Sequence, residues 1–151
     1  TLADFRLHQF VRCIKGFILP DNGEATKQFK SRSELFVGPS RHPQMGELYE
    51  LRSSAEHLHD VLDGLHGSNL KEGRLLLYQH AIEAEGIARH CIRRLLSKSD
   101  LWPYFENDEK LRSFWKLAAS ERRYIWGDPL DAAELSACFE RASIRVEELC
   151  E

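Results

Sequence analysis

Apolar residues recur every three or four positions along most of the chain, which is the pattern of amphipathic helices. In the first segment, from Leu2 to Ile18, this spacing gives one apolar face made of Phe5, Phe10, Val11, Ile14, Phe17 and Ile18. The same pattern predicts further helices over Thr26–Phe36, Gln44–Leu65, Lys71–Lys98, Asp108–Ser120 and Pro129–Cys150. Residues that favour turns separate these segments at Pro20–Gly23, Gly38–Ser40, Asp100–Tyr104 and Trp126–Pro129.

Two of the predicted helices carry buried stripes at helical spacing. We expect the helix over 44–65 to bury Leu48, Leu51, Ala55, Leu58 and Leu62. We expect the helix over 71–98 to bury Leu75, Leu76, Ile82, Ile87, Cys91 and Leu95. Asp128 can cap the last helix, and Pro129 suits its first turn. Because no stretch alternates like a strand, the sequence predicts an all-α antiparallel bundle of about five to six helices in one domain over residues 1–151.

The composition is that of an ordinary globular domain, with 42% hydrophobic and 30% charged residues. A net charge of −3 argues against binding nucleic acid over the whole surface, although a local RNA or nucleotide site needs only local charge. The cysteines at 13, 91, 138 and 150 lack metal-ligand spacing and predict reduced thiols. No apolar run has the length of a membrane span, so we expect a cytoplasmic protein with no membrane partner. Because the chain begins at Thr1, we expect it to belong to a longer polypeptide.

Metal chemistry has one candidate, the pair Glu56-x-x-His59, whose spacing occurs in di-iron helical bundles. Such a site needs a second Glu-x-x-His and further carboxylates, and the chain has no second copy. A zinc site built from His57, His80 and His90 is conceivable but follows no spacing rule. We therefore favour exposed helix charge for these residues, and we expect no metal and no cofactor.

The strongest candidate chemistry lies in Arg52–His57, within the helix predicted over 44–65. An Arg can form a forked pair with a phosphate and stabilise the charge that develops on it during cleavage. A His titrates near neutral pH and can move a proton to or from the 2′-hydroxyl or the leaving oxygen of RNA. Ser53 and Glu56 lie between these two residues and could orient them or tune their pKa values. This chemistry requires no metal.

This arrangement resembles the HEPN superfamily, whose signature is an Arg, then four to six residues, then a His, usually with a polar residue after the Arg. The segment LYELRSSAEHLHD at 48–60 looks like the motif helix of HEPN-type domains that close longer bacterial polypeptides. FRLHQFVRCIKGFI at 5–18 and FWKLAASERRYIWGDPLD at 114–131 look like flanking parts of those domains, so the resemblance covers nearly the whole chain. It implies a metal-independent endoribonuclease, either a defence effector or a toxin, that leaves 2′,3′-cyclic phosphate ends. It also implies a sensor domain or inhibitor outside this chain.

Spacing alone does not single out Arg52 and His57. Three pairs in the chain fit the family rule, namely Arg52–His57, Arg52–His59 and Arg74–His80, and chance alone gives about two. Ser53 and the surrounding residues favour the first pair, whereas Arg74 precedes an apolar run typical of a core.

Helix geometry sets a further condition on the pair. Residues five apart on an ideal helix point about 140° away from each other, so Arg52 and His57 do not share a face. The resemblance implies a homodimer in which two motif helices meet and hold RNA in the cleft between them.

A basic strip on the helix over 71–98 could guide RNA to this site. Arg89, Arg93 and Arg94 are the expected RNA contacts, and the strip also includes Lys71, Arg74, His90 and Lys98. The alternative is a solvated helix end, partly neutralised by Glu83 and Glu85, whose cations favour the helix C-terminus. Tyr49 and Tyr78 could stack on a base, although core packing with one wet edge is the more common role for such residues.

Two functions therefore remain open. The first is the endoribonuclease, with His57 as general acid or base and Arg52 as the phosphate-binding group. The second is a non-catalytic module that dimerises or binds a nucleotide through the same helix, since a fold does not by itself establish an activity. In that case Arg52 is a solvated or interface residue and His57 is half-buried.

Overall fold

The structure, a computed structural model, describes residues 2–55, 68–131, 133–137 and 140, without the side chains of 2–4, 53–55 and 68–71. Every regular element in these ranges is a helix, which confirms the all-α class. The elements are α1 (Leu2–Ile18), α2 (Ala25–Val37), η1 (Pro39–Arg41), α3 (His42–Ala55), α5 (Ser68–Ser97), η2 (Ser99–Tyr104), α6 (Asp108–Lys116) and α7 (Ala119–Trp126). The second half of the helix predicted over 44–65 lies outside the described residues.

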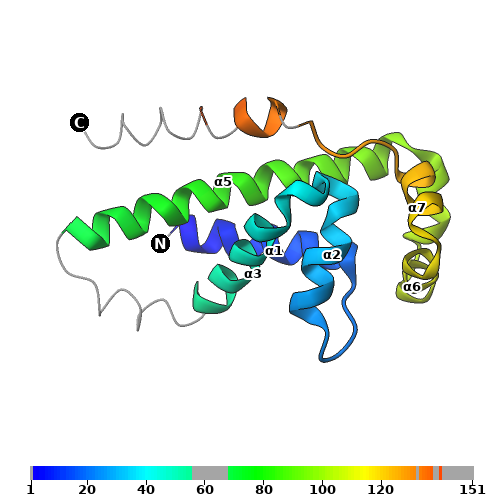
Figure 1. Ribbon diagram of the computed structural model, residues 1–151, viewed down its shortest axis with the longest axis horizontal. Helices are drawn as coiled ribbons and strands as arrows, with labels where there is room; N and C mark the ends of the chain where they lie inside the picture. Colours follow the sequence, from blue (N-terminus) through cyan, green and yellow to red (C-terminus); the bar gives the residue numbers. More distant parts are fainter. Residues whose placement is uncertain (1, 56–67, 132, 138–139, 141–151) are drawn as a thin grey trace.

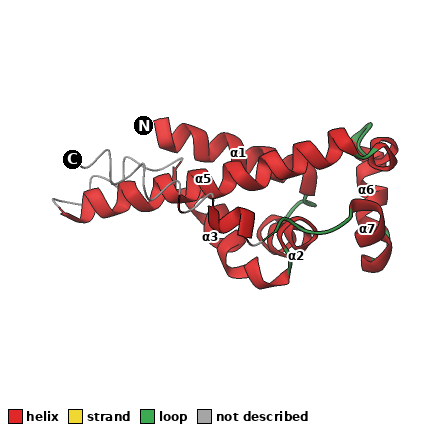
Figure 2. Cartoon of the chain, turned by 90° about the horizontal axis from the view of Figure 1, so that it is seen from above, coloured by secondary structure: helices red, strands yellow, loops and turns green. Residues whose placement is uncertain are grey.

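The most extensive helix contact joins α1 and α5, which lie side by side and run in the same direction (Figures 1 and 2). α2 and α3 lie between them in the sequence, and this pair is parallel. Arg6 and Glu85 join the two helices through an ion pair of 2.5 Å between Nη2 and Oε2. α6 and α7 lie together at the far end of α5 (Figure 1).

The face that α5 buries differs from the face expected from the sequence. Leu77 is 6% exposed, whereas Leu76 is 50% exposed. Small residues complete the buried face, since Ala81, Ala84 and Ala88 are also buried. Three consecutive leucines cover almost every direction around a helix, so the run does not reveal which face is buried. The other residues expected there divide into buried Ile87 and Cys91 and partly buried Leu75, Ile82 and Leu95.

The first helix follows its predicted pattern more closely. Val11, Ile14, Phe17 and Ile18 are buried, and Leu7 joins them one turn earlier. Phe5, expected on this face, is instead 62% exposed. It lies near the start of α1.

The helix predicted over 108–120 is wrong in extent, because the structure has two shorter helices there. Asn107 caps the start of α6, since its side chain accepts a hydrogen bond of 3.0 Å from the backbone N–H of Lys110. It ends where Leu117 adopts an extended conformation, with φ −63° and ψ 156°. α7 then begins at Ala119. The predicted turn at Asp100–Tyr104 lies in the 3₁₀ helix η2, which accommodates Pro103.

The start of the last predicted helix is also displaced. Residues 129–131 are not helical, whereas residues 133–137 are. The Oδ1 atom of Asp131, rather than Asp128, accepts a hydrogen bond of 2.9 Å from a following backbone N–H, that of Ala133. The remainder of this predicted helix is almost entirely outside the described residues.

An aromatic cluster forms the centre of the core where α2, α6, α7 and η2 meet α1. Trp126 is fully buried, with its ring centroid 4.8 Å from that of Phe36 and 6.4 Å from those of Phe17 and Phe105. Trp115 meets Phe36 edge-on at 6.1 Å, and its Nε1 donates a 3.0 Å hydrogen bond to the carbonyl oxygen of Phe17. Such contacts add to the large apolar area that each ring buries.

Replacing Phe36 by Ala removes the ring that touches both tryptophans. We expect Phe36→Ala to lower the free energy of unfolding by about 3–5 kcal/mol, because the cavity can collapse only partly. Leu96→Ala is the matched control, since Leu96 is 71% exposed, and we expect a change within about 0.5 kcal/mol. Urea unfolding followed by circular dichroism measures both. Equal effects of the two substitutions would contradict the central position of the cluster.

Candidate functional site

Arg52 lies in the last turn of α3, and an aromatic stack holds its position. Its guanidinium carbon is 5.9 Å from the ring centroid of Tyr49, one turn earlier on the same helix. The ring of Tyr49 in turn lies 4.9 Å from that of the fully buried Phe29 on α2. Arg52 is half-buried. The core thus supports a cation at the surface through one tyrosine, a geometry in which the cation–π attraction restricts the side chain.

The other predicted members of this site are Ser53, Glu56 and His57. The backbone of Ser53 belongs to α3, but its side chain is outside the described residues, as are Glu56, His57 and His59. The convergence of Arg52 with His57 therefore stays a prediction. Tyr49, considered above as a platform for a base, contacts both Phe29 and Arg52.

The expected RNA contacts on α5 divide into two groups. Arg89 and Arg93 are exposed, and Arg89 forms an ion pair of 2.7 Å with Glu85 one turn earlier. Arg94 instead turns towards α7, where its Nη1 donates a hydrogen bond of 2.8 Å to the carbonyl oxygen of Trp126. Lys98 lies beside it, with Nζ 3.4 Å from the carbonyl oxygen of Tyr124. Of these four cations, Arg89 and Arg93 are exposed, whereas Arg94 and Lys98 bind carbonyl groups of α7.

Gly127 explains how Arg94 reaches this carbonyl group. Its φ is +98°, a backbone conformation that side chains rarely allow, and it directly follows α7. A Cβ atom at this position would overlap the Nη1 atom of Arg94. The guanidinium carbon of Arg94 also lies 6.0 Å from the ring centroid of Trp126. The break predicted at Trp126–Pro129 is therefore the end of α7, where Gly127 leaves room for the side chain of Arg94.

His90 occupies the space between the basic strip and the core. Its ring centroid is 6.3 Å from that of Trp126, and its Nε2 is buried without a hydrogen-bond partner in the structure. Burial lowers the pKa of His90 to about 4, helped by the positive charges of Arg94 and Arg93. The ring is therefore neutral at physiological pH and contributes no charge for RNA binding.

Sequence reasoning missed three arginines that serve the same purpose as Arg94. Arg32 donates hydrogen bonds of 2.9 and 3.0 Å to the carbonyl oxygens of Ile18 and Leu19, just where α1 ends. Arg123 donates to the carbonyl oxygens of Glu34 and Leu35 on α2 at 3.0 and 2.8 Å.

Arg122 acts at the end of α6, where it bonds to the carbonyl oxygens of Trp115 and Leu117. Cations near a helix C-terminus are a general sequence signal, but these three arginines belong to other helices than those whose ends they bind.

Metal-binding groups do not assemble in the described part of the chain. No group of three or more His, Cys, Asp or Glu side chains there could hold a metal ion. His80 lies near Glu83, with Nδ1 3.5 Å from Oε2, and His90 contacts Trp126 instead. Glu83 is 2% exposed, so this pair belongs to the core side of α5.

Comparisons with known proteins give no relative: no family model, curated protein or solved structure matches this chain. None of the helices in the described ranges has both the length and the apolar character that crossing a membrane demands. The function must therefore be argued from the residues themselves.

A comparison of Arg94 with its neighbour Arg93 separates a structural from a surface role. We expect Arg94→Met to lower the free energy of unfolding by about 1–3 kcal/mol, because the end of α7 loses a charged hydrogen-bond donor. Arg93→Met removes the same charge from an exposed position on the same helix, and its effect should stay within about 0.5 kcal/mol. Thermal and urea unfolding measure both. A similar loss in the two variants would refute the capping role of Arg94.

The pKa of His90 also predicts how stability depends on pH. Because the pKa falls from 6.5 to about 4 on folding, the unfolded chain takes up this proton at a higher pH than the folded protein does. The contribution of neutral His90 is thus complete above pH 6.5 and is lost as the pH falls towards 4. We expect His90→Gln to flatten the decline of unfolding free energy over this window. An unchanged slope in His90→Gln would contradict this role of the neutral ring.

Proposed function

We propose that this chain is a HEPN-like, metal-independent endoribonuclease domain whose site is built on the α3 segment that carries Arg52. The observation that carries the proposal is the local sequence around Arg52 and His57, in a chain whose described regular elements are all helices. The position of Arg52 supports it. The side chain is half-buried and stacks on Tyr49, which restricts the guanidinium group that would bind a phosphate.

The proposed chemistry assigns one role to each residue. His57 removes the proton from the 2′-hydroxyl or supplies one to the leaving oxygen. Arg52 binds the scissile phosphate and stabilises the negative charge that develops on it. Ser53 and Glu56 orient the two. Arg89 and Arg93, which face outward on α5, are suited to hold flanking phosphates, whereas Arg94 is bound to α7.

The direct test is cleavage of labelled single-stranded RNA in the presence of a chelator. We expect the wild type to release fragments with 2′,3′-cyclic phosphate ends, and Arg52→Ala and His57→Ala each to lower the rate at least about a hundredfold. Arg112→Ala removes an exposed arginine of α6, outside the proposed site, and should keep full activity. Absence of cleavage by wild-type protein at micromolar concentration would refute the nuclease proposal for this domain.

Mixing the two inactive variants tests whether the site is shared between two copies. If Arg52 of one chain works with His57 of another, random re-association of Arg52→Ala with His57→Ala regenerates complete sites. About a quarter of the wild-type sites should return. If both residues act within one chain, the mixture stays inactive.

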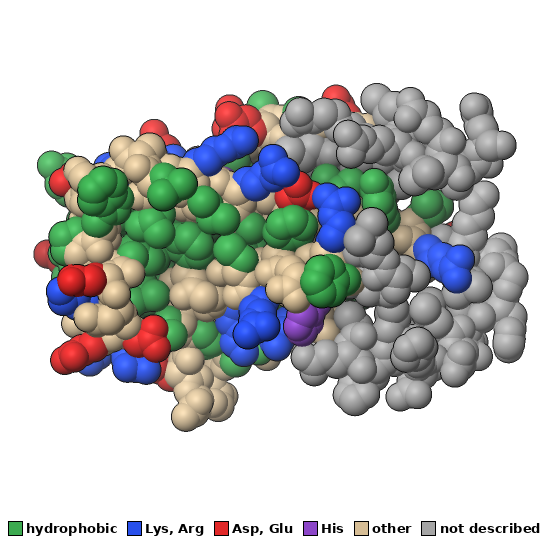
Figure 3. All heavy atoms as spheres, turned by 180° about the vertical axis from the view of Figure 1, so that it is seen from behind, with side chains coloured by type: hydrophobic (Ala, Val, Ile, Leu, Met, Phe, Trp, Pro, Cys, Tyr) green, Lys and Arg blue, Asp and Glu red, His purple; other side chains and the backbone are tan. Residues whose placement is uncertain are grey.

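A non-catalytic interaction module is the second candidate, and exposed apolar side chains favour it. Ile92 and Leu96, four residues apart on α5, are 42% and 71% exposed, and Trp102 on η2 is 56% exposed. On the face seen in Figure 3, hydrophobic side chains gather in a band with Lys and Arg side chains beside it. Contiguous apolar surface of this kind often marks a protein interface. Self-association without RNA cleavage would support this candidate.

A further inference from the structure

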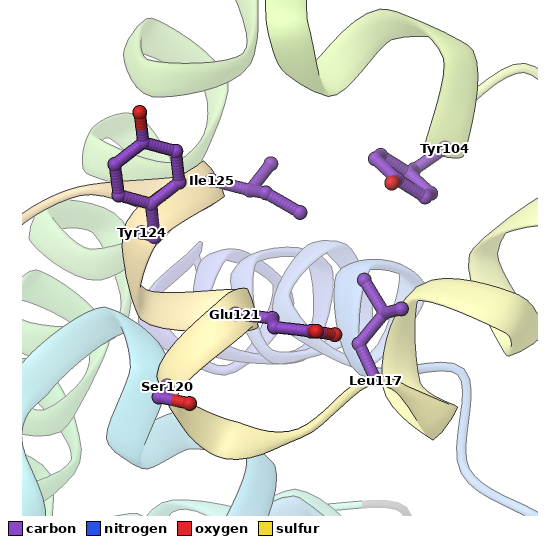
Figure 4. Close-up of a pocket in the computed structure, with 6 residues that line it drawn as sticks. All are labelled: Tyr104, Leu117, Ser120, Glu121, Tyr124 and Ile125. Atoms are coloured by element: carbon purple, nitrogen blue, oxygen red, sulfur yellow. The ribbon is translucent and has the colours of Figure 1, made fainter.

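An open cleft of about 430 Å³ lies where η2, α6 and α7 meet, remote in sequence from Arg52. Its lining residues are Tyr104, Leu117, Ser120, Glu121, Tyr124 and Ile125. Figure 4 shows the side chains of Tyr104, Leu117 and Ile125 directed into one space, with the Glu121 carboxylate reaching into it from α7. The cleft therefore combines apolar and aromatic walls with one acidic group.

The charge in this cleft depends on which partners the charged side chains of α7 bind. Arg122 and Arg123 follow Glu121 directly, but both guanidinium groups bind backbone carbonyl oxygens. Glu121 is exposed and has no ion-pair or hydrogen-bond partner among the described residues. Glu121 is thus the one charged residue in the lining, and the two adjacent arginines are already bonded to backbone carbonyl groups, that of Leu117 in the lining among them.

Tyr124 adds an exposed aromatic ring to the edge of the cleft. It is 87% exposed, the highest value among the large hydrophobic residues in the described part of the chain. Figure 4 shows its ring pointing away from the enclosed space, whereas the ring of Tyr104 borders the space that the Glu121 carboxylate enters. An aromatic ring and a carboxylate around one space suit a cation that can stack and bond at once. Arginine meets both requirements better than lysine, because its planar group forks onto a carboxylate and stacks on a ring. Its aliphatic stem would lie against Leu117 and Ile125.

We propose that this cleft binds an arginine side chain presented by a partner protein. Glu121 accepts the guanidinium hydrogen bonds, the ring of Tyr104 packs against the guanidinium group, and the apolar walls cover the stem of the arginine. This inference is independent of RNA cleavage, because it uses neither Arg52 nor the basic residues of α5.

The test uses two peptides and ¹⁵N-labelled protein followed by nuclear magnetic resonance. The first peptide is acetyl-Gly-Leu-Arg-Gly-amide, and the second replaces Arg by citrulline, which keeps the shape but lacks the charge. We expect saturable shifts at the amides of Leu117, Glu121 and Ile125 with the arginine peptide. The citrulline peptide should bind about tenfold more weakly, since the charge-assisted pair is lost.

Matched variants of the protein complete the experiment. We expect Glu121→Gln to weaken binding of the arginine peptide by the same factor, about tenfold. Glu109→Gln removes an exposed carboxylate of α6 that does not line the cleft, and its affinity should equal that of the wild type. Equal binding of the two peptides to the wild type, shifts that map elsewhere, or no saturable shift at millimolar peptide would each overturn the proposal.

Discussion

The fold depends on arginine side chains that bind the carbonyl groups at helix ends. Helices of eight to seventeen residues leave many of their last carbonyl groups without a partner inside the helix. Several of these ends adjoin the aromatic core, where water has little access and an unsatisfied carbonyl is costly. In the described part of the chain, arginines from other elements bond at the ends of four helices: Arg32 at α1, Arg123 at α2, Arg122 at α6 and Arg94 at α7.

The same arginines also bind the aromatic core to the helices around it. The guanidinium carbons of Arg32 and Arg122 lie 5.3 and 5.6 Å from the ring centroid of Trp115, so cations approach this ring from two helices. Burial lowers the pKa of Arg32, which shows that the group has given up part of its hydration. Carbonyl oxygens and the ring faces replace some of the lost water. Removal of one arginine would therefore disturb both a helix end and a tryptophan.

The sequence was sufficient to predict the all-α class and the approximate extent of α1, α2 and α5, because their apolar spacing is regular over several turns. It was insufficient for the ends of shorter elements. The break between α6 and α7 is not visible in the sequence, because no Gly or Pro next to Leu117 marks its extended conformation. The roles of Arg32 and Arg123 depend on contacts across the fold, which spacing along a helix does not encode. For the candidate site, the local sequence makes Arg52 a candidate only, whereas its contact with Tyr49 and the contact of Tyr49 with Phe29 are features of the folded structure.

The use of arginines in the core changes how the surface charge should be interpreted. The chain has 21 Lys and Arg residues against 24 Asp and Glu residues. Four of the arginines bind backbone carbonyl groups. The expected RNA-binding strip on α5 is accordingly smaller than the sequence suggests, and its Arg89 forms an ion pair with Glu85. Arg52 stacks on Tyr49 in the last turn of α3, next to the proposed catalytic segment. Specific binding of a phosphate here would thus depend on one positioned arginine more than on a broad basic face.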